Sequence, residues 1–462
     1  MRLIMSISRA WLAGILSCTL AGFAGSTASA MPSGLRSQGD SEFGSRFSAS
    51  SKTSALSRNA CGDANAAEPA IPFPASPDSD TFYAQPKPFP NVARGTILAA
   101  RAATYSPDGL TMPNTAYQIK FVSCDIHEQP IAAVATVVKP LLPVAGVGGE
   151  PLFVENFAED ALGAQCAPSH SVTGSTADVN ADLENAVSFS ALAAGWTVMF
   201  PDYEGPSSEF GAGHLEGQIV LDSIRATERF TPLGLNQHTM VGINGYSGGA
   251  IATSWAATLQ RSYAPDLNIV SVSSGGTPAD TLSILNNIDT NTVANLAFFD
   301  LIFMAAVGDN RAYPFMATPI LNSAGVAAAT AMENGCLGDN SNGSSGPTGT
   351  FYTYTTTSNI DTAPGVVKAV KLLDLAQPGE PPITNVFVYH SVTDELIPIA
   401  GADNMVAAWC AAGAKVEYFR DYAGGDHITT EADNFQNVIA YHASVFNGLP
   451  MVVPPTTTSC NT

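Results

Sequence analysis

The pentapeptide Gly245-Tyr246-Ser247-Gly248-Gly249 constrains this chain more than any other segment. It follows an apolar, strand-like run over residues 239–243 and precedes a helix-like segment over 250–259. A Gly-x-Ser-x-Gly turn between a strand and a helix is typical of a nucleophile elbow, in which glycines permit a tight turn and the serine hydroxyl is exposed. The helix N-terminus favours negative charge beside that hydroxyl. The alternative is an ordinary glycine-rich turn.

The N-terminus predicts a signal peptide over residues 1–30. Arg2 and Arg9 precede an apolar stretch over residues 10–23, and Ala28-Ser29-Ala30 after it is a candidate cleavage site. A membrane anchor is a weaker alternative because the stretch is shorter than about 20 residues. Residues 15–18 faintly resemble a lipoprotein box. We therefore expect a secreted, extracellular protein with no integral membrane span.

Charge and cysteine content narrow the class further. The formal charge of −21 becomes −23 once Arg2 and Arg9 leave with the signal, which argues against nucleic acid and against electrostatic docking to anionic membranes. No cysteine or histidine cluster has metal-ligand spacing, so we expect neither a metal nor another cofactor. An even number of cysteines in an exported protein favours disulfides. The six that remain are Cys61, Cys124, Cys166, Cys336, Cys410 and Cys460.

Short apolar runs alternate with helix-like stretches along the chain, which predicts an α/β fold with a mostly parallel central sheet flanked by helices. In such sheets, active residues gather at the carboxyl ends of the strands. The strand-like runs are 119–123, 131–138, 152–154, 197–200, 240–243, 269–272, 386–389 and 416–419, and two of the clearest helices are 182–194 and 432–446.

The alternation of strand-like and helix-like segments stops between residues 277 and 366, where the sequence predicts no clear strand. Leu282, Leu285 and Ile288 form an apolar stripe, a very apolar helix candidate follows at 293–307, and a loop rich in Asn, Ser and Gly closes the region. We interpret it as a mainly helical cap inserted into the core. The expected organisation is a signal peptide 1–30, a flexible leader 31–65, core 66–276, cap 277–366, core 367–449 and a tail 450–462.

A serine nucleophile requires a histidine base and a carboxylate that orients this histidine. In hydrolases whose nucleophile lies on an elbow between a strand and a helix, the chain order is Ser, acid, His. Three histidines follow Ser247. His390 precedes every plausible acid loop, and His442 is expected within a helix, whereas His427 follows the last predicted core strand. His427 is therefore the candidate base, with a loop-capping histidine as the alternative.

Asp394 is the candidate acid because it directly follows the strand-like run 386–389. Glu395 and Asp403 are rivals, and an exposed turn aspartate is the structural alternative. The oxyanion hole is expected from the amide of Gly248 and from the loop over residues 155–160, since that loop follows an early strand. The His-Gly-Gly-Gly pattern of some lipases is absent.

These blocks together resemble the secretory lipase family of the Candida antarctica lipase A type, within the α/β-hydrolase superfamily. The resemblance rests on the elbow, on Glu159-Asp160 with Cys166-Ala167-Pro168-Ser169, and on the Asp394 and His427 loops. It covers residues 75–450. It implies a Ser247–Asp394–His427 triad, an oxyanion hole containing Asp160 and Gly248, a cap that hosts the acyl chain and a Cys166–Cys336 disulfide.

The sequence departs from that family in two respects. No closely spaced cysteine pair lies near His427, and the long leader and Cys61, Cys410 and Cys460 lack obvious counterparts. The remaining four cysteines allow three pairings, of which we favour Cys61–Cys124 and Cys410–Cys460.

The leading hypothesis is a secreted serine ester hydrolase, a triacylglycerol lipase or carboxylesterase that forms an acyl-enzyme on Ser247 and also transfers acyl groups to alcohols. Phe298, Phe299 and Phe303 of the cap are candidate substrate-binding residues, although they fit a plain cap core equally well. Contact with a lipid interface stays open. The alternatives are a peptidase or other acyltransferase on the same fold, and a non-catalytic binding protein.

Overall fold

A computed structural model describes residues 61, 71–174, 181–290, 292–316, 320–337, 350–377 and 380–461, without the side chains of 181–183, 290, 292–299 and 302. The predicted signal peptide, nearly all of the expected leader and the Asn/Ser/Gly-rich loop up to residue 349 lie outside this part of the chain. Within it, none of the helices combines the length and apolar character that crossing a membrane requires.

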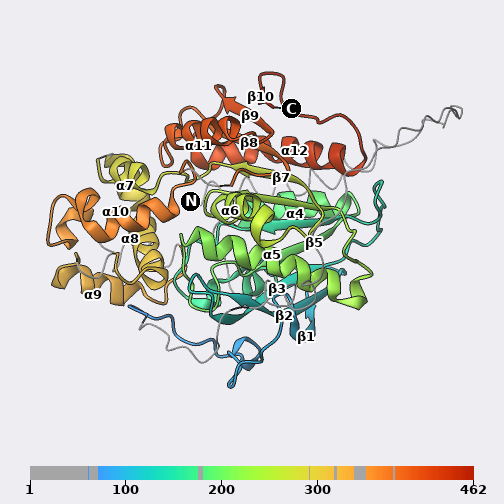
Figure 1. The fold of residues 1–462 in the computed structure, drawn as a ribbon, viewed down its shortest axis with the longest axis horizontal. Helices are drawn as coiled ribbons and strands as arrows, with labels where there is room; N and C mark the ends of the chain where they lie inside the picture. Colours follow the sequence, from blue (N-terminus) through green and yellow to red (C-terminus); the bar gives the residue numbers. More distant parts are fainter. Residues whose placement is uncertain are drawn as a thin grey trace, which may run out of the picture. The chain divides into compact units, whose positions relative to one another are not determined.

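The described strands form one ten-stranded sheet in the order β1-β2-β3-β5-β4-β6-β7-β8-β9-β10 (Figure 1). Neighbours from β5 to β9 pair in parallel, whereas β1, β2, β3 and β10 pair antiparallel at the two edges. The strands are β1 (Ile97–Thr104), β2 (Thr115–Cys124), β3 (Pro130–Val138), β4 (Leu152–Asn156), β5 (Thr197–Pro201), β6 (Val241–Tyr246), β7 (Ile269–Gly275), β8 (Asn385–Ser391), β9 (Val416–Asp421) and β10 (Thr458–Cys460).

This sheet confirms the predicted α/β-hydrolase architecture, since each strand-like run of the sequence lies within or overlaps one of its strands. Two edge strands were not predicted. β1 is rich in alanine and half of its residues are exposed, so its apolar pattern is weak. β10 has only three residues and lies in the expected tail, where it extends the sheet beyond β9.

Helices cover both faces of the sheet. A Cβ at Gly242 of β6 would meet the ring of His442 in α12 at 2.7 Å, whereas one at Gly245 would meet Thr253 in α6 at 2.5 Å. Because residues 242 and 245 face opposite sides of a strand, α12 and α6 lie on opposite faces. The helices of the core are α3 (Pro168–Ser171), α4 (Ala181–Ala193), α5 (Gly213–Arg229), α6 (Gly248–Tyr263), α11 (Ile399–Ala411) and α12 (His427–Phe446).

A second group of helices lies between β7 and β8 in the chain, at one side of the sheet (Figure 1). Its apolar side chains, including Ile288, Phe303 and Met332, form a separate cluster. The last helix of the group passes residue 366, and the cap boundaries stay a prediction. The helices are α7 (Thr281–Thr290), α8 (Thr292–Ala312), α9 (Ser323–Met332) and α10 (Pro364–Leu373).

Two kinds of contact fasten this helical group to the core. Arg311 of α8 donates from Nη1 to the carbonyls of Leu162 and Ser208 at 2.8 and 2.7 Å. A disulfide joins Cys166, in the loop after β4, to Cys336 after α9. A native disulfide of this kind typically contributes about 2–5 kcal/mol. The other two disulfides, Cys61–Cys124 and Cys410–Cys460, follow the favoured pairing.

Candidate active site

Ser247 occupies a strained turn between β6 and α6. Its φ of 52° and ψ of −122° are rare for a residue with a side chain, and such strain is typical of functional turns. The glycines after it are required by close approach. A Cβ at Gly248 would lie 1.8 Å from Oδ1 of Asp160, and one at Gly249 would lie 1.9 Å from the carbonyl oxygen of Asn156. The turn thus presses the start of α6 against the loop that follows β4.

Ser247, His427 and Asp394 form a continuous hydrogen-bonded chain. Nε2 of His427 lies 2.8 Å from Oγ of Ser247, and Nδ1 lies 2.7 Å from Oδ2 of Asp394. Because a carboxylate only accepts, Nδ1 carries the hydrogen, and Nε2 is left to accept the serine proton. Ser247 directly follows β6, Asp394 lies in the turn after β8, and His427 is the first residue of α12, so the fold brings together residues that are far apart in sequence.

The carboxylate of Asp394 is fully buried but well supplied with donors. Its Oδ1 accepts the backbone N–H groups of Leu396 at 3.0 Å and Ile397 at 2.7 Å. Burial pushes the pKa of Asp394 upward, but the charge of His427 and the hydrogen bonds of His390 and His427 outweigh it and hold this pKa below its ordinary value. The group therefore stays ionised beside His427.

His427 is held at its backbone as well as at its ring. Its N–H donates to Oε2 of Glu395 at 2.9 Å, and its carbonyl accepts the hydroxyl of Tyr246 at 2.7 Å. Burial lowers the pKa of the imidazole, but the charge and hydrogen bond of Asp394, with the charges of Glu395 and Glu431, raise it above its ordinary value overall. The site is therefore arranged to stabilise a protonated His427.

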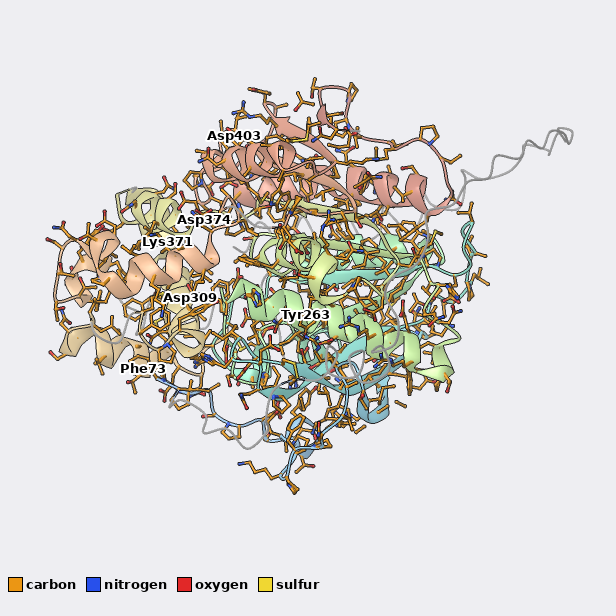
Figure 2. The ribbon with its side chains drawn as sticks, in the orientation of Figure 1. Phe73, Tyr263, Asp309, Lys371, Asp374 and Asp403 are labelled. Atoms are coloured by element: carbon orange, nitrogen blue, oxygen red, sulfur yellow. A yellow bond between two sulfur atoms is a disulfide. The ribbon has the colours of Figure 1, made fainter. Side chains whose placement is uncertain are left out.

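The remaining sequence candidates have other contacts. Glu395 binds the backbone of His427 rather than its ring. Asp403 lies on α11 (Figure 2). It accepts hydrogen bonds from Tyr418 and Arg420. His442 is buried in α12, as a packed helical histidine was expected to be. Sequence reasoning did not anticipate the roles of Tyr246 and His390, because neither contact follows from spacing along the chain.

The loop after β4 brings Asp160 to the elbow. Asp160 is almost fully buried, has a φ of 45°, and places its Oδ1 against Gly248. The neighbouring carboxyl groups of Glu204 and Glu216 have pKa values well above the ordinary range, because they are buried and because other acids, Asp160 among them, lie near. Burial and the nearby acids therefore favour the neutral forms of Glu204 and Glu216.

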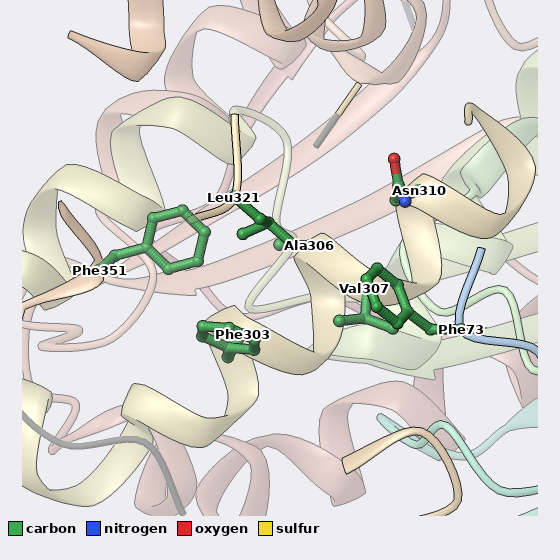
Figure 3. A pocket seen from close by; sticks show the side chains of 7 residues that line it. All are labelled: Phe73, Phe303, Ala306, Val307, Asn310, Leu321 and Phe351. Atoms are coloured by element: carbon green, nitrogen blue, oxygen red, sulfur yellow. The ribbon is translucent and has the colours of Figure 1, made fainter. Parts of the chain in front are cut away.

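Two apolar hollows involve the described residues of the cap. One is lined mainly by apolar side chains, among them Phe73, Phe303 and Phe351 (Figure 3). Phe303 is also part of the cap core and packs against the rings of Phe351 and Tyr354, each with a centroid distance of 5.4 Å. A larger hollow lies among α7, α8 and α10. The side chains of Phe298 and Phe299 lie outside the described residues.

The parallel sheet, the strained serine turn and the acid loop after β8 define the α/β-hydrolase class. The profile of the secretory lipase family matches residues 170–453. The chain is 33% identical to the secreted triacylglycerol lipase LIP1 of Malassezia furfur over 80% of this chain and 76% of the relative. It is 32% identical to lipase 5 of Candida albicans over 77% and 78%.

A solved structure agrees with these sequence relatives. Candida antarctica lipase A in its closed state superposes with a TM-score of 0.74 and 26% identity, covering 83% of this chain and 88% of the other. The chain therefore belongs to the secretory lipase family.

Proposed function

We propose that this protein is an exported serine hydrolase that cleaves the ester bonds of triacylglycerols and related carboxylic esters. This proposal rests mainly on the chain of hydrogen bonds from Asp394 through His427 to Ser247, at 2.7 and 2.8 Å. Relatives named as triacylglycerol lipases support the substrate class. Three disulfides and relatives named as secreted support export.

In the first half of the reaction, Oγ of Ser247 bonds to the ester carbonyl carbon while its proton passes to Nε2 of His427. Asp394 stabilises the imidazolium that results. The tetrahedral intermediate then collapses, the carbon–oxygen bond to the alcohol breaks, and the alcohol takes the proton from Nε2. The acyl group remains on Ser247.

In the second half, a water molecule gives its proton to Nε2 of His427 and bonds to the acyl carbon. Collapse of this second intermediate returns the proton to Oγ of Ser247 and releases the carboxylic acid. A second alcohol in place of water would give acyl transfer. Both intermediates carry an oxyanion, which the amide of Gly248 and Asp160 stabilise in this proposal. Because a carboxylate would repel the oxyanion, Asp160 acts through its backbone amide or as a neutral carboxyl group.

The cap accommodates the acyl chain in this account. The hollow among α7, α8 and α10 is almost entirely apolar, which suits a hydrocarbon chain. Phe303 lines the other hollow, and Phe298 and Phe299 precede it on the same helix. We place the boundaries of this cap at residues 277 and 366, and we propose that the enzyme meets its substrate at a lipid interface.

The decisive test compares wild type with Ser247→Ala on p-nitrophenyl esters of increasing chain length, on a triacylglycerol emulsion and on a peptide. Wild type should hydrolyse the esters, and the variant should lose roughly 10⁶-fold in kcat, down to the background of the assay. Equal ester hydrolysis by both proteins would remove Ser247 from the mechanism. Cleavage of the peptide alone would favour a peptidase, and inertness of wild type on every substrate would favour a binding protein.

A further inference from the structure

His390, the penultimate residue of β8, contacts the proposed catalytic acid although chain order excludes it as the base. Its side chain is fully buried. Nε2 of this ring lies 2.9 Å from the carbonyl oxygen of Ile397 and 3.3 Å from Oδ2 of Asp394. The latter is the same carboxylate oxygen that His427 binds. Asp394 thus lies between two imidazole rings.

The partners of His390 determine its tautomer. Both groups beside Nε2 are acceptors, a carbonyl and a carboxylate oxygen, so Nε2 must carry the hydrogen. Nδ1 has no hydrogen-bond partner among the described residues. The ring therefore serves this region only as a donor, through one N–H shared between Ile397 and Asp394.

These contacts close a small ring of hydrogen bonds. Ile397 donates its N–H to Oδ1 of Asp394 at 2.7 Å and accepts from His390 through its carbonyl. His390 in turn faces Oδ2 of Asp394. Both oxygens of the carboxylate are thereby tied to the turn that carries them. On the cap side, Asn287 of α7 donates to the carbonyl of Leu396 at 3.1 Å, so the turn is fastened from two directions.

We propose that His390 is a positioning residue for ester hydrolysis, whose Nε2–H fixes the carboxylate of Asp394 in the orientation that binds His427. This inference rests on the function proposed above. Without the donor, the buried carbonyl of Ile397 loses its partner and Oδ2 of Asp394 loses one of the two groups that define its direction. A carboxylate free to rotate orients His427 for only part of the time, which lowers kcat and leaves ester binding nearly unchanged.

The test uses two substitutions that separate the N–H group from the volume of the ring. His390→Phe fills the space without a donor, whereas the amide of His390→Gln supplies an N–H near the position of Nε2. The matched control is His442→Gln, which changes another buried histidine whose hydrogen bonds go to Ser271 and Ser273. Rates are expressed per active serine, titrated with a fluorophosphonate, so that misfolded protein does not count.

We expect His390→Phe to lose about 100-fold in kcat, the cost of a catalytic group misplaced by about 1 Å, with KM within about twofold of wild type. His390→Gln should recover most of this loss, and His442→Gln should keep the wild-type kcat. The low-field proton signal of the His427 Nδ1–H should broaden or shift in His390→Phe and return in His390→Gln.

Other outcomes are equally informative. A His390→Phe variant with wild-type kcat and an unchanged low-field signal overturns the positioning role while leaving the proposed hydrolase intact. Equal losses in His390→Phe and His390→Gln, with the His427 signal unchanged in both, overturn it as well, because the N–H is then irrelevant. If the wild-type protein does not hydrolyse esters, that result contradicts the proposed function itself. It is obtained before any His390 variant is compared.

Discussion

The helix α12 contains two buried histidines whose environments are opposite. His427, at its first turn, contacts a carboxylate and a serine hydroxyl, and its pKa is raised overall. His442, four turns later, binds the hydroxyls of Ser271 and Ser273, each at 2.7 Å, and burial lowers its pKa to about 3. Burial alone makes an imidazole a weaker base, so the carboxylate of Asp394 is what distinguishes the two rings.

His442 serves the fold rather than the reaction. It lies against β6 so closely that Gly242 has no room for a Cβ, and its ring packs on Phe153 with a centroid distance of 5.0 Å. Its two serine partners are on β7. The contact therefore fixes α12 to the strands β6 and β7.

The largest effect should come from removing the charge that distinguishes the two rings. Asp394→Asn should lower kcat by about 10⁴-fold, because the amide no longer orients the imidazole or stabilises its protonated form. The measurement is ester hydrolysis per titrated serine. Glu395→Gln is the matched control from the adjacent rival acid, and its kcat should fall by less than about tenfold because it contacts only the backbone of His427. The reverse order of losses would make Glu395 the acid.

The pH profile of wild type tests the same contrast without a substitution. His427 must be neutral to accept the serine proton, so kcat/KM should fall about tenfold per pH unit on the acid side, with a midpoint above the ordinary value of 6.5. The raised value comes from the charges of Asp394, Glu395 and Glu431 around the ring. A midpoint well below 6.5 would show that burial dominates at His427 as it does at His442.

His442 should instead appear in the pH dependence of stability. The pKa of His442 is lowered in the folded protein, so below pH 6.5 this residue is protonated in the unfolded chain but stays neutral in the folded protein. Wild type should therefore lose about 1.4 kcal/mol of unfolding free energy per pH unit from this residue alone, between pH 6.5 and about 3.

The variant His442→Gln isolates that contribution. It should be less stable than wild type near neutrality, because two hydrogen bonds and ring packing are lost, but the difference should shrink as pH falls. Urea unfolding of both proteins with disulfides intact provides the measurement. A difference that stays constant or grows with acidity would mean that His442 takes up its proton in the folded state.

Much of this arrangement is predictable from the sequence. Apolar runs indicated the central strands, and the places of Ser247, Asp394 and His427 after them followed from chain order. The helix α5 was not predicted, because its buried face includes charged residues such as Glu216, Asp222 and Arg225, which hide an apolar stripe. The contact of His390 with Asp394 depends on how one turn folds back on its strand, and spacing does not encode it.

The smallest effect concerns the hydrogen bond that the hydroxyl of Tyr246 donates to the backbone carbonyl of His427. Tyr246→Phe removes the hydroxyl that donates to the carbonyl of His427 at 2.7 Å, while the ring stays packed against Tyr389 at a centroid distance of 5.7 Å. One lost hydrogen bond contributes about 1 kcal/mol, so kcat should fall by up to about fivefold. Tyr389→Phe is the control, since that ring is on β8, two strands from β6. If both variants lower kcat equally, the hydrogen bond from Tyr246 does not position the base, because a hydroxyl on another strand then has the same effect.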